Sequence, residues 1–183
     1  MWSSNIRAGI IGGETYVAGM GDELNDEDVA GFAVWFGPGQ GFHLTEDQRK
    51  NSGYEELSKK RSPENRKWEE EVLLPMCETL DEKTIGSSAK LASYHLQFLA
   101  VAPESQGKGI GKALVMSIQS QADKLGVDTC LETATELNIS IYKRMGYTVL
   151  DSITIPSTWG DSPFHFMHRR ANAPIPDGAV IQA

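Results

Sequence analysis

The spacing of apolar residues divides the chain into alternating strands and helices. Two runs rich in β-branched and aromatic residues, 15–20 and 29–36, flank an acidic segment at 22–28 and predict two strands joined by a solvated connection. The sequence Gly37–Gly41 contains three glycines and a proline, which stop the second strand. Later runs of the same apolar kind predict four more strands, at 94–102, 127–133, 147–155 and 164–169.

Helical spacing dominates between and after these runs. Ile110, Leu114, Ile118 and Leu125, with Ala113 and Ala122 beside them, predict one helix with a single apolar face. A second, short helix is predicted at 138–145, where Gly146 provides a left-handed end.

A charged segment from Thr45 to about Leu80 is rich in good helix formers. Within it Ser62 and Pro63 are typical of a helix start, as the cap and the first turn. Pro75 predicts an end or a kink, because proline has no N–H to donate. The predicted buried stripe of this helix consists of Trp68, Val72, Leu73 and Met76. The following residues, 81–90, predict a polar connection.

Clustered glycines lie between the strand at 94–102 and the helix that follows it, in the segment Gln106-Gly107-Lys108-Gly109-Ile110-Gly111-Lys112. Glycine has no Cβ, so a ligand can approach the backbone closely there. The start of the helix adds unpaired N–H groups and a partial positive charge, and the two lysines add full charges. The loop therefore predicts an anion site, although a purely structural turn is the alternative.

Two nucleotide-binding patterns fit this loop poorly. The triphosphate loop fails twice, because Gln106 stands at its first glycine and Ala113 at its hydroxyl position. The dinucleotide fingerprint begins correctly at Gly107 and Gly109, but Lys112 replaces its last glycine and would hinder close packing of helix on strand. Glu132 could imitate the ribose-binding acid of that fingerprint, so a dinucleotide-binding domain stays open as the less favoured reading.

A third pattern accounts for more of the sequence. Residues 106–111 match the [QR]-x-x-G-x-[GA] loop of the GNAT superfamily of N-acetyltransferases, and the preceding segment 99–103 resembles the bulged strand of that family. Further along, 138–147 resembles its N…LY-x-x-x-G-[FY] segment. Three motifs in the family's order are more specific than one glycine loop. The resemblance implies an α/β (α+β) fold with a mixed, mostly antiparallel central sheet flanked by helices, in which acetyl-CoA lies between two splayed strands.

The resemblance also implies roles for individual residues. Backbone amides of the loop would hold the pyrophosphate of coenzyme A, and polar groups of the bulged strand would pair with the pantetheine arm. An amide near Val101 would stabilise the developing oxyanion. The implied cofactor-binding residues are Leu99, Ala100, Val101, Gln106, Gly107, Lys108, Gly109, Ile110, Gly111, Lys112, Asn138 and Tyr142. No metal is expected.

Two of these residues keep an alternative reading. Tyr142 corresponds to the family's tyrosine near the cofactor sulfur, where its hydroxyl would donate to the leaving thiolate as the catalytic residue. Its alternative role is to pack the short helix on the sheet. Asn138 either contacts the cofactor or caps the helix that it begins.

The general base is not fixed by any motif. One is needed because amines with a pKa of about 10 arrive protonated at neutral pH. Glu132, at the end of its strand, and His95, on the strand that leads to the bulge, are the candidates, and a water chain is the third.

The chain departs from the family pattern at its start. The family opens with a strand and two helices, whereas about a dozen residues precede Glu14 here, too few for that unit. Either the given chain is shortened, or its acceptor site is open or completed by another chain. The first strand would then be a sheet edge, which residues 6–11 cover or through which the protein forms a homodimer. The long segment 45–90 is expected to cover the acceptor site.

Composition narrows the remaining possibilities. The 183 residues suit one domain, expected at 1–170 and followed by a loose tail at 171–183. A net charge of −8 argues against nucleic acid as a partner, which needs a basic face. Two cysteines, Cys77 and Cys130, build no disulfide framework and are expected to be reduced. No run is apolar enough to span a membrane and no signal peptide is evident, so a cytoplasmic protein is expected, with the nucleus also open.

Together these features predict an acetyl-CoA-dependent N-acetyltransferase that moves the acetyl group directly to a primary amine. The acceptor, a small-molecule amine or a protein amine, is left open. A second hypothesis is a non-catalytic acyl-CoA-binding module of the same fold that lacks a complete acceptor site.

Overall fold

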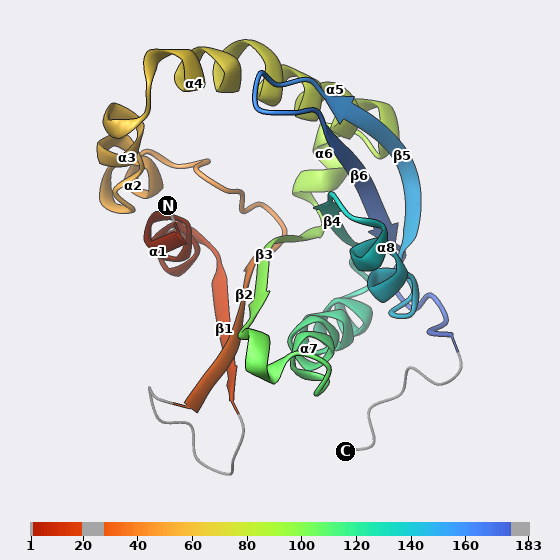
Figure 1. The fold of residues 1–183 in the computed structure, drawn as a ribbon. Coiled ribbons are helices and arrows are strands. Elements are labelled where there is room, and N and C mark those ends of the chain that lie inside the picture. The colour runs from red at the N-terminus through yellow and green to blue at the C-terminus, as the bar shows by residue number, and fades with distance from the viewer. Residues whose placement is uncertain (1, 20–27, 177–183) are drawn as a thin grey trace.

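A six-stranded mixed sheet forms the centre of the computed structural model, which describes residues 2–19 and 28–176 (Figure 1). Its strands are β1 (Glu14–Gly19), β2 (Val29–Phe36), β3 (Tyr94–Val101), β4 (Thr129–Thr133), β5 (Thr148–Ile155) and β6 (Ser162–Arg169). They lie in the order β1-β2-β3-β4-β6-β5, and β3–β4 is the parallel pair. All six predicted strands and the mixed, mostly antiparallel sheet are confirmed, with ends displaced by one or two residues.

The parallel pair separates soon after it begins. Tyr94, His95 and Leu96 are in register with 129–131, and no pair follows Leu96↔Leu131. On its other side β3 stays paired with β2 throughout, but its register shifts between Phe98 and Leu96, which leaves Gln97 as an extra residue. A bulge of this kind bends and twists its strand locally. From Gln97 onward, the edge of β3 that faces β4 has no strand partner in the described part of the chain.

One face of the sheet is covered by α7 (Ile110–Leu125) and α8 (Glu136–Lys143). The apolar face predicted for α7 is confirmed at Ile110, Leu114, Ile118 and Ala122, which are buried. Leu125 is 61% exposed, because it lies in the last turn beyond the sheet. Ala113 is exposed as well; Val115 and Gln119 are buried in addition.

The other face is covered at one end by α1 (Trp2–Gly12), which packs on β1 and β2. This packing is close: a Cβ on Gly9 would come within 2.4 Å of Val34 Cγ1. The prediction that residues 6–11 cover the β1 edge as a strand is wrong, because they are helical and rest on the face of the sheet. β1 remains an edge strand, as expected.

Residues 46–91 form a helical arch, which runs from α1 across to the far side of the sheet (Figure 1). It consists of α2 (Glu46–Asn51), α3 (Tyr54–Lys60), α4 (Pro63–Trp68), a π-helical turn η2 (Glu69–Leu73), α5 (Leu74–Thr84) and α6 (Ser87–Leu91). We call α2–α6 the arch. The polar connection predicted at 81–90 is wrong, since α5 continues to Thr84 and α6 follows.

The start and the middle of the long helix follow from its sequence. Ser62 caps α4 by accepting from the N–H of Asn65, as predicted. Pro75 neither ends nor visibly breaks the helix. It stands in the first turn of α5, directly after the π-helical turn, where the N–H of Leu74 bonds to the carbonyl of Glu69 five residues earlier. The wider turn accommodates the proline that would otherwise interrupt the hydrogen-bond ladder.

The far foot of the arch is fixed to the sheet. Leu80 of α5 is 1% exposed and packs with Cys130 and Phe166 on β4 and β6. Lys83 forms an ion pair of 2.7 Å with Asp151 on β5. Burial of Leu80 contributes on the order of 2 kcal/mol to this attachment.

The predicted loose tail begins later than residue 171. The N–H of Ala171 bonds to Asp128 at 2.8 Å, and that of Asn172 to Asp123 at 2.7 Å. The part of the predicted tail at 177–183 lies outside the described residues. Both cysteines are free thiols, and within the described ranges no helix combines the length and apolarity that a membrane crossing needs.

Candidate functional site

A cavity of about 620 Å³ opens where β3 leaves β4, between the start of α7 and α8. It brings together ten of the twelve residues predicted to bind the cofactor: Leu99, Val101, Gln106, Gly107, Gly109, Ile110, Gly111, Lys112, Asn138 and Tyr142. These residues come from segments that are far apart in the sequence. Their convergence on one cavity supports reading the three motifs as parts of a single site.

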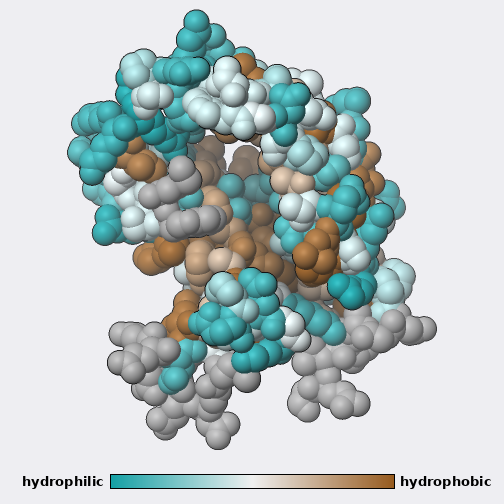
Figure 2. Space-filling view, viewed as in Figure 1, coloured by the Kyte–Doolittle hydropathy of each residue, from teal (hydrophilic) through white to brown (hydrophobic). Residues whose placement is uncertain are grey.

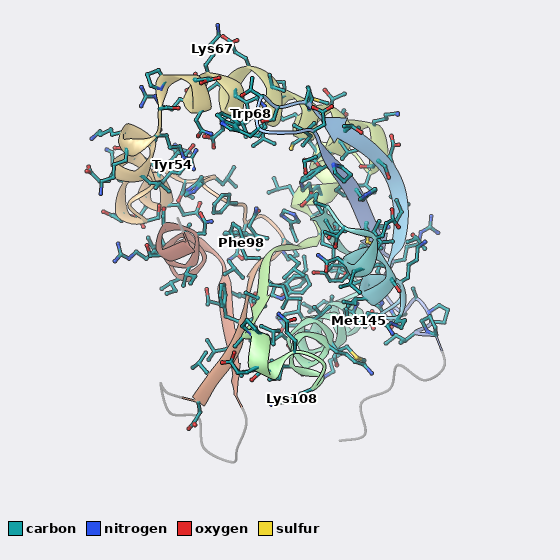
Figure 3. The ribbon with its side chains drawn as sticks, in the orientation of Figure 1. Tyr54, Lys67, Trp68, Phe98, Lys108 and Met145 are labelled. Carbon is teal, nitrogen blue, oxygen red and sulfur yellow. The ribbon has the colours of Figure 1, made fainter. Side chains whose placement is uncertain are left out.

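Ala100 and Lys108 do not line the cavity. Side chains alternate along a strand, so Ala100 points to the opposite face from Leu99 and Val101. Lys108 lies at the tip of the loop, beyond the start of α7 (Figure 3). Their backbone groups stay close to the site, but their side chains take no part in the lining.

The loop has the backbone shape that the glycines were expected to allow. Gly107 and Gly109 have φ of +76° and +84°, in the left-handed region that other residues adopt at a cost. Gly109 is the residue before α7, so the free N–H groups of the first helical turn face the cavity. Gly111 is helical, and a Cβ there would lie 3.4 Å from Val101 Cγ2, between the loop and the strand.

Five further residues of the lining were not predicted: Ser105, Leu137, Ile141, Arg144 and Met145. Four of them are on or just after α8, on the face that carries Asn138 and Tyr142. Helical spacing around those two residues would have identified them. Arg144 matters most chemically, because it adds a second cationic residue to the lining of the cavity, in addition to Lys112.

Tyr142 is 8% exposed, and burial raises the pKa of its hydroxyl to about 12. The phenol is therefore protonated, and a hydrogen-bond donor, over the whole physiological range. Its ring also packs edge-on against Tyr147 at 5.8 Å, so the packing role exists beside any chemical one.

Asn138 does not cap α8. That role belongs to Thr135, whose hydroxyl accepts from the N–H of Asn138 at 3.2 Å. The capping alternative for Asn138 is thus wrong by one turn, because the helix starts at Glu136 and not at 138. Its amide side chain lies in the cavity instead.

A charged cluster lies on the opposite face of the sheet, where the two strands part. His95 Nε2 is 2.7 Å from Glu132 Oε2, and the second oxygen of Glu132 accepts from Lys90 Nζ at 2.6 Å. Lys90 also donates to Asp81 at 2.7 Å. We call these four side chains the His95–Glu132 cluster. Both predicted base candidates therefore belong to one network, and each is 12% exposed at the side chain.

The network determines which of its members ionise. Burial favours the neutral form of Glu132, but His95 and Lys90 outweigh it and lower the pKa of this carboxyl to about 2. Desolvation opposes the charge on Lys90, yet Glu132 and Asp81 raise its pKa above the usual value. Glu132 is thus a firmly held anion. In the described residues, no group of three or more His, Cys, Asp and Glu side chains could hold a metal ion.

A hollow lies beneath the arch (Figure 2). Tyr54 of α3, Trp68 of α4 and Phe98 of β3 lie around it from three sides (Figure 3). Phe42 packs edge-on against Phe98 at 5.5 Å, and His43 stacks between Phe42 and Tyr54 at 3.9 and 4.2 Å. The side of this hollow that faces α1 is therefore an aromatic wall. The charged cluster lies at the far foot of the arch, where α5 and α6 provide Asp81 and Lys90.

The match to a family model agrees with the position of the cavity. Residues 76–149 match the acetyltransferase (GNAT) domain. That range contains β3, the glycine loop, α7, β4, α8 and all the residues that line the cavity. The family resemblance predicted from the motifs is confirmed over this part of the chain.

Solved structures show the same fold. The polyamine N-acetyltransferase of Drosophila melanogaster superposes with a TM-score of 0.55 at 14% identity, over 86% of this chain and 75% of that one. The ribosomal-protein-S18-alanine N-acetyltransferase of Escherichia coli has a TM-score of 0.46 at 16% identity, over 84% of this chain and 69% of that one. Nourseothricin acetyltransferase has a TM-score of 0.47 at 22% identity, over 86% of this chain and 64% of that one. Of these three structures, only the Drosophila enzyme has a TM-score above 0.5, and the assignment of the fold rests on it.

The ion pairs of Glu132 predict how stability depends on pH. Because the folded pKa of about 2 lies below the ordinary glutamate pKa of 4.5, the carboxylate stabilises the fold fully above about pH 4.5. That contribution is lost as the pH falls toward 2. Glu132→Gln should therefore cost about 2 kcal/mol near neutral pH, and the deficit should shrink on acidification. Urea unfolding of the wild type and of Glu132→Gln between pH 3 and pH 7 measures this difference in stability. A difference that does not change with pH would contradict the ion pairing.

Proposed function

We infer that this chain, whose residues 76–149 match the acetyltransferase (GNAT) domain, transfers an acetyl group from acetyl-CoA to a primary amine. One observation carries the proposal above the others. Where β3 and β4 part, a cavity suited to the cofactor lies toward one face of the sheet, and a cluster with a proton acceptor lies on the other face. A ligand placed in the opening between the strands touches both.

The residues present fit acetyl-CoA. Its pyrophosphate finds the free N–H groups at the start of α7, with Lys112 and Arg144 in the lining. Beyond Leu96 the edge of β3 that faces β4 has no strand partner in the described residues, so its backbone can pair with the amide-containing pantetheine arm as a strand would. Leu99 and Val101 provide the apolar wall beside that arm. The N–H groups of this edge are also the donors that would stabilise a developing oxyanion.

When bound, acetyl-CoA supplies an acetyl group on a sulfur that can leave as a thiolate. Tyr142 is the residue that meets this need in the cavity. Its hydroxyl is protonated up to about pH 12, so it donates a hydrogen bond wherever the enzyme works. A free thiol has a pKa of about 8.5, so a donated hydrogen bond stabilises the thiolate without requiring full proton transfer.

His95 is the better candidate for the general base. Glu132 has a pKa of about 2 and is occupied by two partners, so it is a poor acceptor for the proton of an amine. Its carboxylate instead orients His95 through Nε2, as an acid orients histidine in hydrolase triads. The other ring nitrogen, Nδ1, then takes the proton. The reacting amine would lie between His95 on one face and the opening of the strands on the other.

Acetyl-CoA is expected to raise the melting temperature, whereas NAD and ATP at equal concentration are not. At 100 times its dissociation constant a ligand adds about 2.7 kcal/mol of stability. Gly109→Glu should abolish the shift, because it places a side chain and a negative charge at the anion site. Gly126→Glu is the matched control: Gly126 has φ +69° at the other end of α7 and equally open surroundings. An equal shift in both variants, or a larger shift with NAD, would refute the assignment.

Tyr142→Phe should lower kcat by about 10- to 1,000-fold and change acetyl-CoA binding little, since the hydroxyl acts mainly as the thiolate leaves. The phenyl ring retains the packing on Tyr147. Steady-state kinetics and thermal shift on the same samples separate the two effects. Full turnover in a folded Tyr142→Phe protein would reduce this residue to packing.

His95→Gln should lower kcat/KM by about 100-fold at pH 7. The deficit should fall as the pH approaches 10, because the amine then arrives already deprotonated. A profile of kcat/KM against pH for both proteins tests this. A residue with a merely structural role would produce a deficit that does not depend on pH.

A further inference from the structure

The arch is tied down at three places, so it forms a fixed bridge over the opening between the strands. At its near foot, the buried Gln48 of α2 donates from Nε2 to the carbonyl of Ala8 in α1 at 3.4 Å. At its far foot, Leu80 is buried on the sheet and Lys83 pairs with Asp151. Because both ends of the arch are held, the size of the space beneath it is fixed as well.

The third tie closes the bridge from above. Trp68 Nε1 donates to the carbonyl of Pro156 at 2.8 Å, in the turn between β5 and β6. In the same turn Trp159 lies edge-on against Trp68, with ring centroids 6.1 Å apart. Thr158 bonds to Glu64 at 3.4 Å. We call Trp68, Trp159 and the turn at 156–161 the clasp. It joins α4 to the β5–β6 hairpin, so the hollow is bounded by protein on several sides (Figures 1 and 2).

The surfaces inside this enclosure point to the chemistry of its ligand. Tyr54, Phe98 and Trp68 are each half-buried around it, and aromatic faces attract ammonium groups and apolar chains alike. The His95–Glu132 cluster lies at the far foot of the arch, because its Asp81 and Lys90 belong to α5 and α6. Its two carboxylates, Asp81 and Glu132, share the single ammonium group of Lys90, and carboxylates attract a cation.

We propose that the acceptor is a small, slender organic amine that reaches His95 through the space under the arch, and that the clasp limits its girth. The proposal rests on the function inferred above and adds the substrate class and two specificity-determining residues, Trp68 and Trp159. The amine nitrogen lies at the His95–Glu132 cluster, and its apolar body lies along the aromatic rings. The surface of a folded protein is too broad to enter a space closed by α4 and the hairpin, so a protein lysine is a poor acceptor.

The test compares two amines with the same two-carbon arm and different girth, 2-phenylethylamine and 2,2-diphenylethylamine. Release of coenzyme A thiol from acetyl-CoA gives kcat/KM for each. The wild-type protein should prefer the slender amine by at least about tenfold. Trp159→Ala, which removes a side chain that is 61% exposed, should reduce that preference by about tenfold. Trp68→Ala should do the same, whereas Trp68→Phe should retain most of it.

Leu125→Ala is the matched control, since Leu125 is also 61% exposed but lies at the far end of α7. Its preference should equal that of the wild type. An unchanged preference in both clasp variants would overturn the proposal, as would a folded protein that is acetylated with a higher kcat/KM than every small amine. Thermal shift with acetyl-CoA on the same variants separates the two levels: if the cofactor binds and the girth test fails, only the acceptor proposal falls. If acetyl-CoA does not bind the wild type, the proposed function falls with it.

Discussion

The separation of β3 from β4 is the constraint on which the rest of this structure depends. Parallel strands normally continue side by side, because each backbone group left unpaired in the interior costs free energy. Here the register is lost after Leu96↔Leu131, and the extra residue Gln97 turns the remainder of β3 away. The unpaired edge needs a partner, and an amide-containing ligand can be that partner. Cavity, glycine loop and α8 are all arranged around this one opening.

The same opening also lies between two groups of residues, the cavity on one face of the sheet and the His95–Glu132 cluster on the other. Alternation along β3, reset by the extra residue Gln97, sends Leu99 and Val101 toward the cavity and His95 and Phe98 to the other side. Tyr142 thus serves one face while the His95–Glu132 cluster serves the other. In the proposed reaction the donor and the acceptor of protons therefore approach the reacting groups from opposite faces of the sheet.

The sequence predicted the strands, α7 and ten of the fifteen residues that line the cavity, because these depend on local pattern: alternation, helical spacing and left-handed glycines. It did not reveal which side chains of a strand face the cavity, so Ala100 was included without a side-chain role there. Nor did it reveal the first helix, because the glycines there suggested a weak strand. In the structure Gly9 of this helix packs closely on Val34. The arch was expected only as charged helices over the acceptor site. Its ties, such as Trp68 with Pro156, join residues 88 positions apart, and no local pattern reports such contacts.

The π-helical turn at Glu69–Leu73 has a geometric consequence for the arch. In an ordinary α-helix each residue advances by about 100°, so Trp68 and Leu80, twelve positions apart, would point about 120° away from each other. A wide turn absorbs one residue and reduces the difference to about 20°. One continuous helix can therefore direct Trp68 to the hairpin and Leu80 to the sheet along nearly the same line. Removal of a single residue from this turn would rotate one anchor away from its partner, so the length of this segment is constrained even where its side chains are exposed.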